Sequence, residues 1–136
     1  IGIPLAPFLH AGLMHAASNT VPVVILGTLV GLTGPGRFVG TSLVVTVGGG
    51  LAVWCLARGG AHVGASMLVF GYFGYLLANA FHDRSAKSVL LAIVTFVLYA
   101  GLIWGVLPLE RGVSWEGHLF GVLAGIGAAR LMQERR

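Results

Sequence analysis

Residues 115–125 of the chain read WEGHLFGVLAG and carry glycine at every fourth position, at Gly117, Gly121 and Gly125. Two overlapping small-xxx-small repeats of this kind let membrane helices bring their backbones close together. His118 lies three residues before Gly121 and seven before Gly125, so its ring shares the glycine face of a helix. The stretch therefore predicts a helix packed tightly against a neighbour, with a histidine near the contact.

Around this stretch, the chain is too apolar for a water-soluble domain. Of its 136 residues, 57% are hydrophobic and 9% are charged, whereas soluble domains carry about 25% charged residues. The mean hydropathy of +0.93 indicates a membrane protein. The pI near 10.0 does not indicate nucleic-acid binding, because the eight basic residues are too few and too scattered to follow a phosphate backbone. We expect a lipid bilayer as a partner and no nucleic acid.

Charged and turn residues divide the chain into five apolar blocks, at residues 7–30, 38–57, 63–81, 88–107 and 115–132. Each block is long enough to span a hydrocarbon core of about 30 Å. Only helices and closed barrels satisfy their backbone in lipid, and no block shows the two-residue alternation of barrel strands. The expected fold is all-α, a polytopic transmembrane helical bundle with five spans in one domain over residues 1–136.

The basic residues predict how the bundle is oriented. If the five spans alternate, six of the eight basic residues fall on one side of the membrane, together with the C-terminus. The positive-inside rule makes that side cytoplasmic. We therefore expect an integral protein of the plasma (inner) membrane. Because the chain starts at Ile1 without a basic flank, we also expect a further span upstream.

Polar side chains near the start of three blocks stand out, because polar groups at membrane depth are costly and usually functional. His15 and Asn19 are four residues apart and share a helix face. Ser66 and His118 open the third and fifth blocks, which begin on the same extracytoplasmic side as the first. Close packing of these two glycine-bearing helices would bring the Ser66 hydroxyl to the His118 ring. A nucleophile beside a base is the arrangement of acyl-transfer catalysis.

No carboxylate is placed to complete a catalytic triad. Glu116 is two residues before His118 and points to nearly the opposite helix face. The remaining acids lie in a loop or on the cytoplasmic side, at Glu110, Asp83 and Glu134. The sequence therefore predicts a Ser-His dyad. Donors for the developing oxyanion are the Asn19 amide, a ring N–H of His15 and the backbone N–H of Ser66.

Three motifs occur in order along the chain: HAGLMHAASN at residues 10–19, GAS at 64–66 and HLFGVLAG at 118–125. They resemble the rhomboid intramembrane serine proteases, which show H-x4-H-x3-N, G-x-S-G and H-x2-G-x3-G on their second, fourth and sixth helices. The resemblance covers nearly the whole chain and agrees with the predicted orientation. It implies that the chain supplies helices two to six of a six-helix core, without the first helix.

The resemblance also implies roles for individual residues. Ser66 is the implied nucleophile and His118 the general base and acid, while His15 and Asn19 line the oxyanion hole. The implied activity is a serine endopeptidase that cleaves transmembrane protein substrates near the extracytoplasmic face, without a cofactor or metal. Among the supporting residues, Gly64 is implied to allow the tight entry before the nucleophile, and Phe70 to pack on the catalytic ring. Gly121 and Gly125 are implied to hold their helix against the one that carries Ser66, and His10 to support structure near the end of the first loop.

Two alternatives stay open. Met67 replaces the glycine that follows the nucleophile in the family, and its thioether either narrows the oxyanion region or faces a neighbouring helix. A second hypothesis is therefore an inactive rhomboid-like protein that binds transmembrane segments. The third is a metal or solute transporter, because three histidines lie on one side. However, His10 and His15 are about 140° apart around a helix, which disfavours a shared site.

Each residue taken alone also has a structural interpretation. Ser66 alone is more typical of helix packing than of catalysis. Asn19 is also consistent with a polar clasp between helices, and Phe70 with ordinary core packing. The combination with His118 and the glycine spacing favours the catalytic interpretation.

Overall fold

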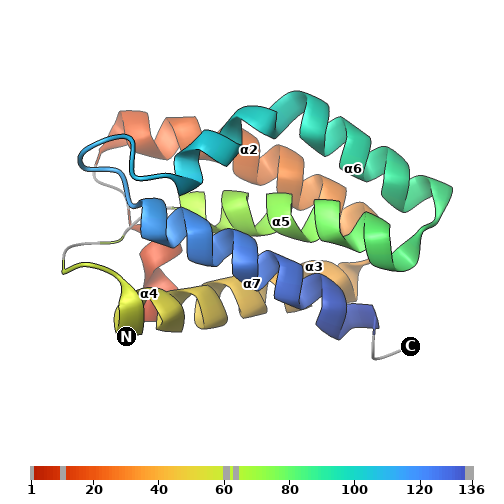
Figure 1. Cartoon of the computed structure of the whole chain (residues 1–136), viewed down its shortest axis with the longest axis horizontal. Helices are drawn as coiled ribbons and strands as arrows, with labels where there is room; N and C mark the ends of the chain where they lie inside the picture. The colour runs from red at the N-terminus through yellow and green to blue at the C-terminus, as the bar shows by residue number, and fades with distance from the viewer. Residues whose placement is uncertain (1, 10–11, 60–61, 63–64, 134–136) are drawn as a thin grey trace.

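A computed structural model describes residues 2–9, 12–59, 62 and 65–133, and the described part is entirely helices and turns (Figure 1). Two short elements come first, α1 (Gly2–Leu5) and η1 (Ala6–Phe8). The long helical segments that follow are α2 (Leu13–Leu32); α3 (Pro35–Leu43) continued by the π-helical η2 (Val44–Gly49) and α4 (Gly50–Leu56); α5 (Ser66–Asp83); α6 (Ala86–Tyr99) continued by the 3-10 helix η3 (Ala100–Val106); and α7 (Trp115–Gln133). The all-α fold class is confirmed.

Two helices begin later than the sequence blocks predict. The first long helix begins at Leu13 rather than at residue 7, because Pro7 lies in the separate turn η1 and the chain is extended at Gly12. The third begins at Ser66 rather than at residue 63. Ser66 is therefore the first residue of α5, which places its side chain at the end of the helix.

Three of the long segments are long and apolar enough to cross a membrane, namely α2, the continuous segment Pro35–Leu56 and the continuous segment Ala86–Val106. This composition is that of an integral membrane protein. The described helices α5 and α7 fall outside this set although they have 18 and 19 residues. They contain strongly polar or charged side chains, such as Asn79 and Asp83 in α5 and Glu116 and Arg130 in α7, and their part in a five-span topology stays a prediction.

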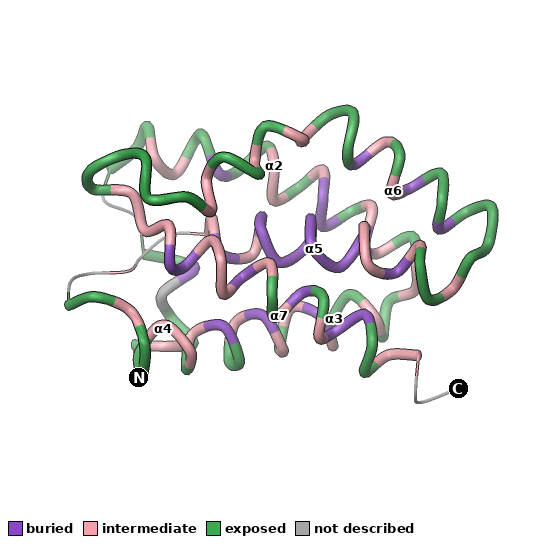
Figure 2. Tube along the Cα trace, viewed as in Figure 1, coloured by how far each residue is buried: buried purple, intermediate pink, exposed green. Residues whose placement is uncertain are grey.

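The central element of the bundle is α5, which the other long helices surround (Figures 1 and 2). Over half of its residues are buried, and Tyr75 and Leu76 are almost completely inaccessible. A helix enclosed by protein does not meet lipid, and can therefore be less apolar than its neighbours. The core cluster around it consists of Leu26, Val30, Val69, Tyr72, Phe73, Tyr75, Leu76, Leu91, Ala128 and Ala129.

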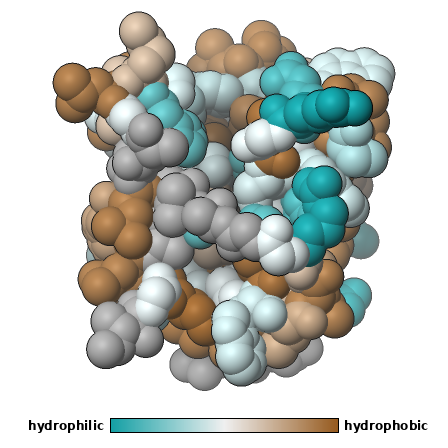
Figure 3. Space-filling model, turned by 90° about the vertical axis from the view of Figure 1, so that its left-hand side faces the viewer, coloured by the Kyte–Doolittle hydropathy of each residue, from teal (hydrophilic) through white to brown (hydrophobic). Residues whose placement is uncertain are grey.

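The helices α2, α5 and α7 all begin at the same end of the bundle, on the left in Figure 1. Figure 3 shows this end face-on, with hydrophilic side chains gathered on one side of it and apolar ones along the opposite side. The first turns of these three helices carry His15, Ser66 and His118. The fold thus gathers the candidate residues at one end.

The opposite end is tied together by the side chain of Asn79, which is 1% exposed. Its oxygen accepts hydrogen bonds from Arg37 Nη1 at 3.3 Å and Gln133 Nε2 at 3.1 Å, and its nitrogen donates to Ser88 Oγ at 3.0 Å. These partners come from α3, α7 and α6. One buried amide in α5 therefore links all three helices at this end.

Candidate active site

The helices α5 and α7 meet through glycines along their whole crossing. A Cβ atom added to Gly121 would lie 2.6 Å from the carbonyl oxygen of Met67, and one added to Gly74 would lie 2.6 Å from that of Val122. A Cβ on Gly125 would overlap the Gly71 carbonyl oxygen. No side chain larger than hydrogen fits at these positions without moving a backbone. The two helices that carry Ser66 and His118 are consequently in direct backbone contact.

The ring of His118 is held against Phe70 of α5. The two rings stack with their centroids 4.0 Å apart and an angle of 9° between their planes. Phe70 is buried, and the stack is closed on one side by Gly105 of η3, where an added Cβ would lie 2.6 Å from Phe70 Cζ. Packing from two elements thus fixes the plane of the His118 imidazole.

A backbone carbonyl fixes the proton on this ring. His118 Nδ1 lies 2.8 Å from the carbonyl oxygen of Gly105. Because a carbonyl only accepts hydrogen bonds, Nδ1 must carry the proton. The neutral ring therefore has its lone pair on Nε2, which is the state a general base requires. The Gly105 carbonyl thus orients the His118 ring.

Sequence reasoning did not find Gly105. The group that acts is its main-chain oxygen, which every residue possesses, so its residue type gives no signal for it. The short glycine side chain does matter, because η3 must approach the stacked rings closely. That requirement becomes visible only when α5, η3 and α7 are placed together.

Ser66 is half-buried at the start of α5. It lies four residues before Phe70, so the two side chains share one face of the helix. Since Phe70 stacks on His118, Ser66 lies one turn further along the face that meets this ring. No hydrogen bond joins Ser66 to His118 among the contacts of the described residues, and their pairing stays a prediction.

The helix α2 carries the two predicted oxyanion residues, Asn19 and His15. Asn19 is buried at 9% exposure, and its Nδ2 has no hydrogen-bond partner among the described residues. A buried donor left unpaired costs about 1–3 kcal/mol, and natural proteins rarely keep one without a use for it. His15 lies one turn earlier on the same face and is close enough to His118 for an electrostatic interaction.

Met67, the residue after Ser66, packs between helices. Its side chain is 8% exposed and lies between Gly49 of η2 and Gly121 of α7. An added Cβ would lie 3.0 Å from its sulfur at Gly49 and 3.2 Å from its Cγ at Gly121. Of the two interpretations of Met67, the structure therefore has the one in which its thioether faces neighbouring helices.

Two of the predicted supporting residues, His10 and Gly64, lie outside the described residues. Within the described part, no group of three or more His, Cys, Asp or Glu side chains is arranged to hold a metal ion. His62 and His118 instead contact protein groups, namely the Ser114 hydroxyl and Arg58 carbonyl at His62 and the Gly105 carbonyl at His118. The transporter hypothesis gains no support from this arrangement.

Comparisons with known proteins give the family of the chain. Residues 2–135 match the Rhomboid domain family. Uncharacterized proteins of Mycobacterium tuberculosis and Mycobacterium bovis are each 36% identical over 140 residues, which cover 96% of this chain and 58% of theirs. An uncharacterized protein of Mycobacterium leprae is 39% identical over 140 residues, covering 96% of this chain and 55% of its own.

The chain belongs to the rhomboid family. This family includes serine proteases. The chain spans less than two thirds of the length of these relatives. No solved structure matches it significantly.

Proposed function

We propose that the chain is the catalytic core of an intramembrane serine endopeptidase that uses Ser66 and His118. The observation that carries the proposal is the hydrogen bond from His118 Nδ1 to the Gly105 carbonyl oxygen. It leaves the Nε2 lone pair available in a ring fixed by Phe70, on the helix face that leads to Ser66. Family membership adds further support, because the residues at the matching motif positions are present except at Met67, which replaces the glycine after the nucleophile.

The mechanism follows from the roles of these groups. His118 Nε2 takes the proton of Ser66 as the hydroxyl oxygen attacks the scissile carbonyl. The tetrahedral oxyanion is stabilised by the unpaired Nδ2 of Asn19, a ring N–H of His15 and the backbone N–H of Ser66. The protonated His118 then gives its proton to the leaving amine, and water hydrolyses the acyl-enzyme by the same steps in reverse. No cofactor is required.

The proposed substrate is a transmembrane protein segment. The bundle is inserted with five spans, the end that carries Ser66 faces the extracytoplasmic side of the plasma (inner) membrane, and the C-terminus is cytoplasmic. A peptide bond within a helix is shielded by its own hydrogen bonds. We therefore expect cleavage near the membrane surface, in a segment whose helix unwinds easily.

Labelling with a fluorophosphonate probe tests the proposal, because such probes react with activated serines. Detergent-solubilised full-length protein is compared with Ser66→Ala and His118→Ala. Matched controls are Ser42→Ala and His82→Ala, which remove a serine and an exposed histidine elsewhere in the bundle. We expect labelling in the wild type and both controls, and none in the two site variants.

An inactive protein that only binds transmembrane segments would give a different result. Folded wild-type protein that does not label would contradict the protease and favour that alternative. Met67 motivated this alternative, and its place between Gly49 and Gly121 does not support it.

A further inference from the structure

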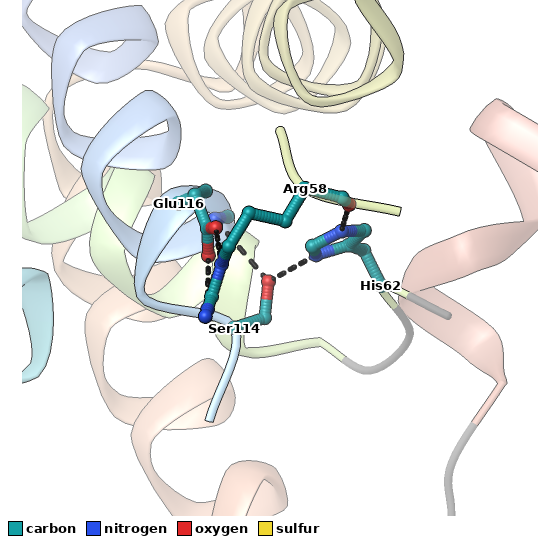
Figure 4. A network of polar contacts seen from close by, with 5 residues as sticks. Arg58, His62, Ser114 and Glu116 are labelled. Atoms are coloured by element: carbon teal, nitrogen blue, oxygen red, sulfur yellow. Dashed lines mark hydrogen bonds and ion pairs between the residues drawn. The ribbon is translucent and has the colours of Figure 1, made fainter. Parts of the chain in front are cut away.

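A polar network joins the connector before α5 to the start of α7 (Figure 4). Arg58 binds the Glu116 carboxylate with two hydrogen bonds, from Nε to Oε1 and from Nη2 to Oε2 at 3.2 Å. His62 Nδ1 lies 2.6 Å from Ser114 Oγ, and His62 Nε2 lies 2.9 Å from the Arg58 carbonyl oxygen. Residues 58–62 lead into Ser66, and residues 114–116 lead into His118. None of these four contacts is used in the proposed mechanism.

The ion pair anchors the connector to α7. The Glu116 side chain is 6% exposed and that of Arg58 is 68% exposed. Glu116 is therefore the buried member of the pair. Breaking the pair would leave its carboxylate as an uncompensated buried charge, which is strongly destabilising. Arg58 reaches over it and also lies 5.8 Å from the centre of the Trp115 ring. The hydrogen bond to Glu116 raises the pKa of Arg58 above its ordinary value, so the guanidinium stays charged.

The histidine contact holds in either protonation state. The Arg58 carbonyl only accepts, so His62 Nε2 carries a proton. In the neutral ring, Nδ1 then accepts from the Ser114 hydroxyl, and in the protonated ring it donates to the same oxygen. Ser114 Oγ also accepts from the backbone N–H of Gly117 at 3.3 Å and so caps α7. One hydroxyl thus holds both the connector and the first turn of α7.

The glycine contacts between α5 and α7 set how closely the two backbones approach. Contact through small residues is made by van der Waals packing, which depends on closeness rather than on direction. Sliding would change the distance from Ser66 to His118. Hydrogen bonds and bidentate ion pairs are directional and oppose such movement. The network stands at the end of the helices where this distance is set.

We infer that Arg58, His62, Ser114 and Glu116 are positioning residues that set the placement of Ser66 relative to His118. The inference rests on the proposed function. These residues act through the nucleophile and the base and do not contact substrate.

The test separates rate from stability with serine variants at the two ends of the bundle. Ser114→Ala removes the hydroxyl, Ser114→Thr retains it, and Ser88→Ala removes a hydrogen bond to buried Asn79 at the far end. For each, fluorophosphonate labelling gives kinact and KI, and thermal unfolding in detergent gives Tm. Because a misplacement of about 1 Å costs up to about 100-fold in rate, we expect kinact of Ser114→Ala to fall about 10- to 100-fold with KI unchanged. Ser114→Thr restores kinact, and Ser88→Ala lowers Tm without lowering kinact.

Other results overturn the inference. If Ser114→Ala labels as fast as the wild type, the positioning role is wrong and the proposed function stands. If Ser88→Ala has the same Tm as Ser114→Ala and loses as much kinact, the loss comes from general destabilisation, and the positioning role is again wrong. Failure of folded wild-type protein to label overturns both. Should Ser114→Ala not fold, Glu116→Gln decides by the same readout, because it keeps the side-chain shape and removes the charge that Arg58 binds.

Discussion

Gly121→Ala is the sharpest perturbation of the contact between α5 and α7. The added Cβ would lie 2.6 Å from the Met67 carbonyl oxygen, about 0.8 Å closer than the 3.4 Å at which ordinary contact begins. The atom that it meets is backbone, so no side-chain rotation relieves the overlap, and the helices must separate next to Ser66. Gly127→Ala is the matched control on the same helix, because an added Cβ there meets nothing within 4 Å.

The free energy of unfolding should change in opposite directions in the two variants. Alanine is favoured over glycine in a helix by about 1 kcal/mol, so Gly127→Ala should be equally or more stable than the wild type. Overpacking costs about 1–3 kcal/mol, so Gly121→Ala should lose up to about 2 kcal/mol after the helix preference is subtracted. Relieving the overlap of about 0.8 Å displaces the backbone beside the nucleophile. Because a misplacement of about 1 Å costs up to about 100-fold in rate, labelling should slow by about 10- to 100-fold.

The assay is fluorophosphonate labelling of both variants, alongside thermal unfolding in the same detergent. Wild-type labelling and wild-type Tm in Gly121→Ala would refute the argument that this backbone contact places the site. Equal losses in Gly127→Ala would refute it too, because the effect would then come from replacing any glycine of α7.

Three further predictions concern single side chains. Asn19→Leu should slow labelling by about 10²–10³-fold, as loss of an oxyanion donor does, yet should not lower Tm, because the Nδ2 donor that it removes is buried and has no partner among the described residues. A wild-type rate would contradict the oxyanion role. Met67→Ala should lower the free energy of unfolding by about 2–5 kcal/mol, because it opens a cavity between Gly49 and Gly121. An unchanged Tm would contradict this, because it would mean that the neighbouring helices close the cavity. Asn79→Ala should destabilise the protein by about 1–3 kcal/mol, because it removes the hydrogen bonds that join Asn79 to Arg37, Ser88 and Gln133. Labelling of the folded fraction should stay near the wild-type rate, and a slower kinact would show that this end affects the site.

Much of the fold can be predicted from the sequence, because lipid leaves a chain few options. Low charge indicates a membrane protein, and because backbone groups in lipid must be satisfied internally, each apolar block is predicted to be a helix. The observed helices follow these blocks closely except at the starts of α2 and α5. At α2, Pro7 lies in a separate turn and Gly12 is extended, and hydrophobic periodicity alone does not resolve such boundaries.

The candidate site can be predicted from the sequence only in part. The spacing of Ser66, His118, Asn19 and their glycines is visible in one dimension, because helical residues three, four and seven apart share a face. Glu116 shows the limit of this reasoning. Its predicted position away from His118 says nothing of Arg58, which lies 58 residues earlier and binds it.

The sequence by itself determined the class of protein and the helical blocks, and it predicts which residues act as nucleophile, base and oxyanion donors. Only the tertiary structure decided that the Gly105 carbonyl orients His118, that Met67 packs between Gly49 and Gly121, and that Arg58 pairs with Glu116. The physical reason is that side-chain type and helical period are properties of the chain. A main-chain oxygen, a gap between helices or an ion pair between distant segments exists only once those helices are packed.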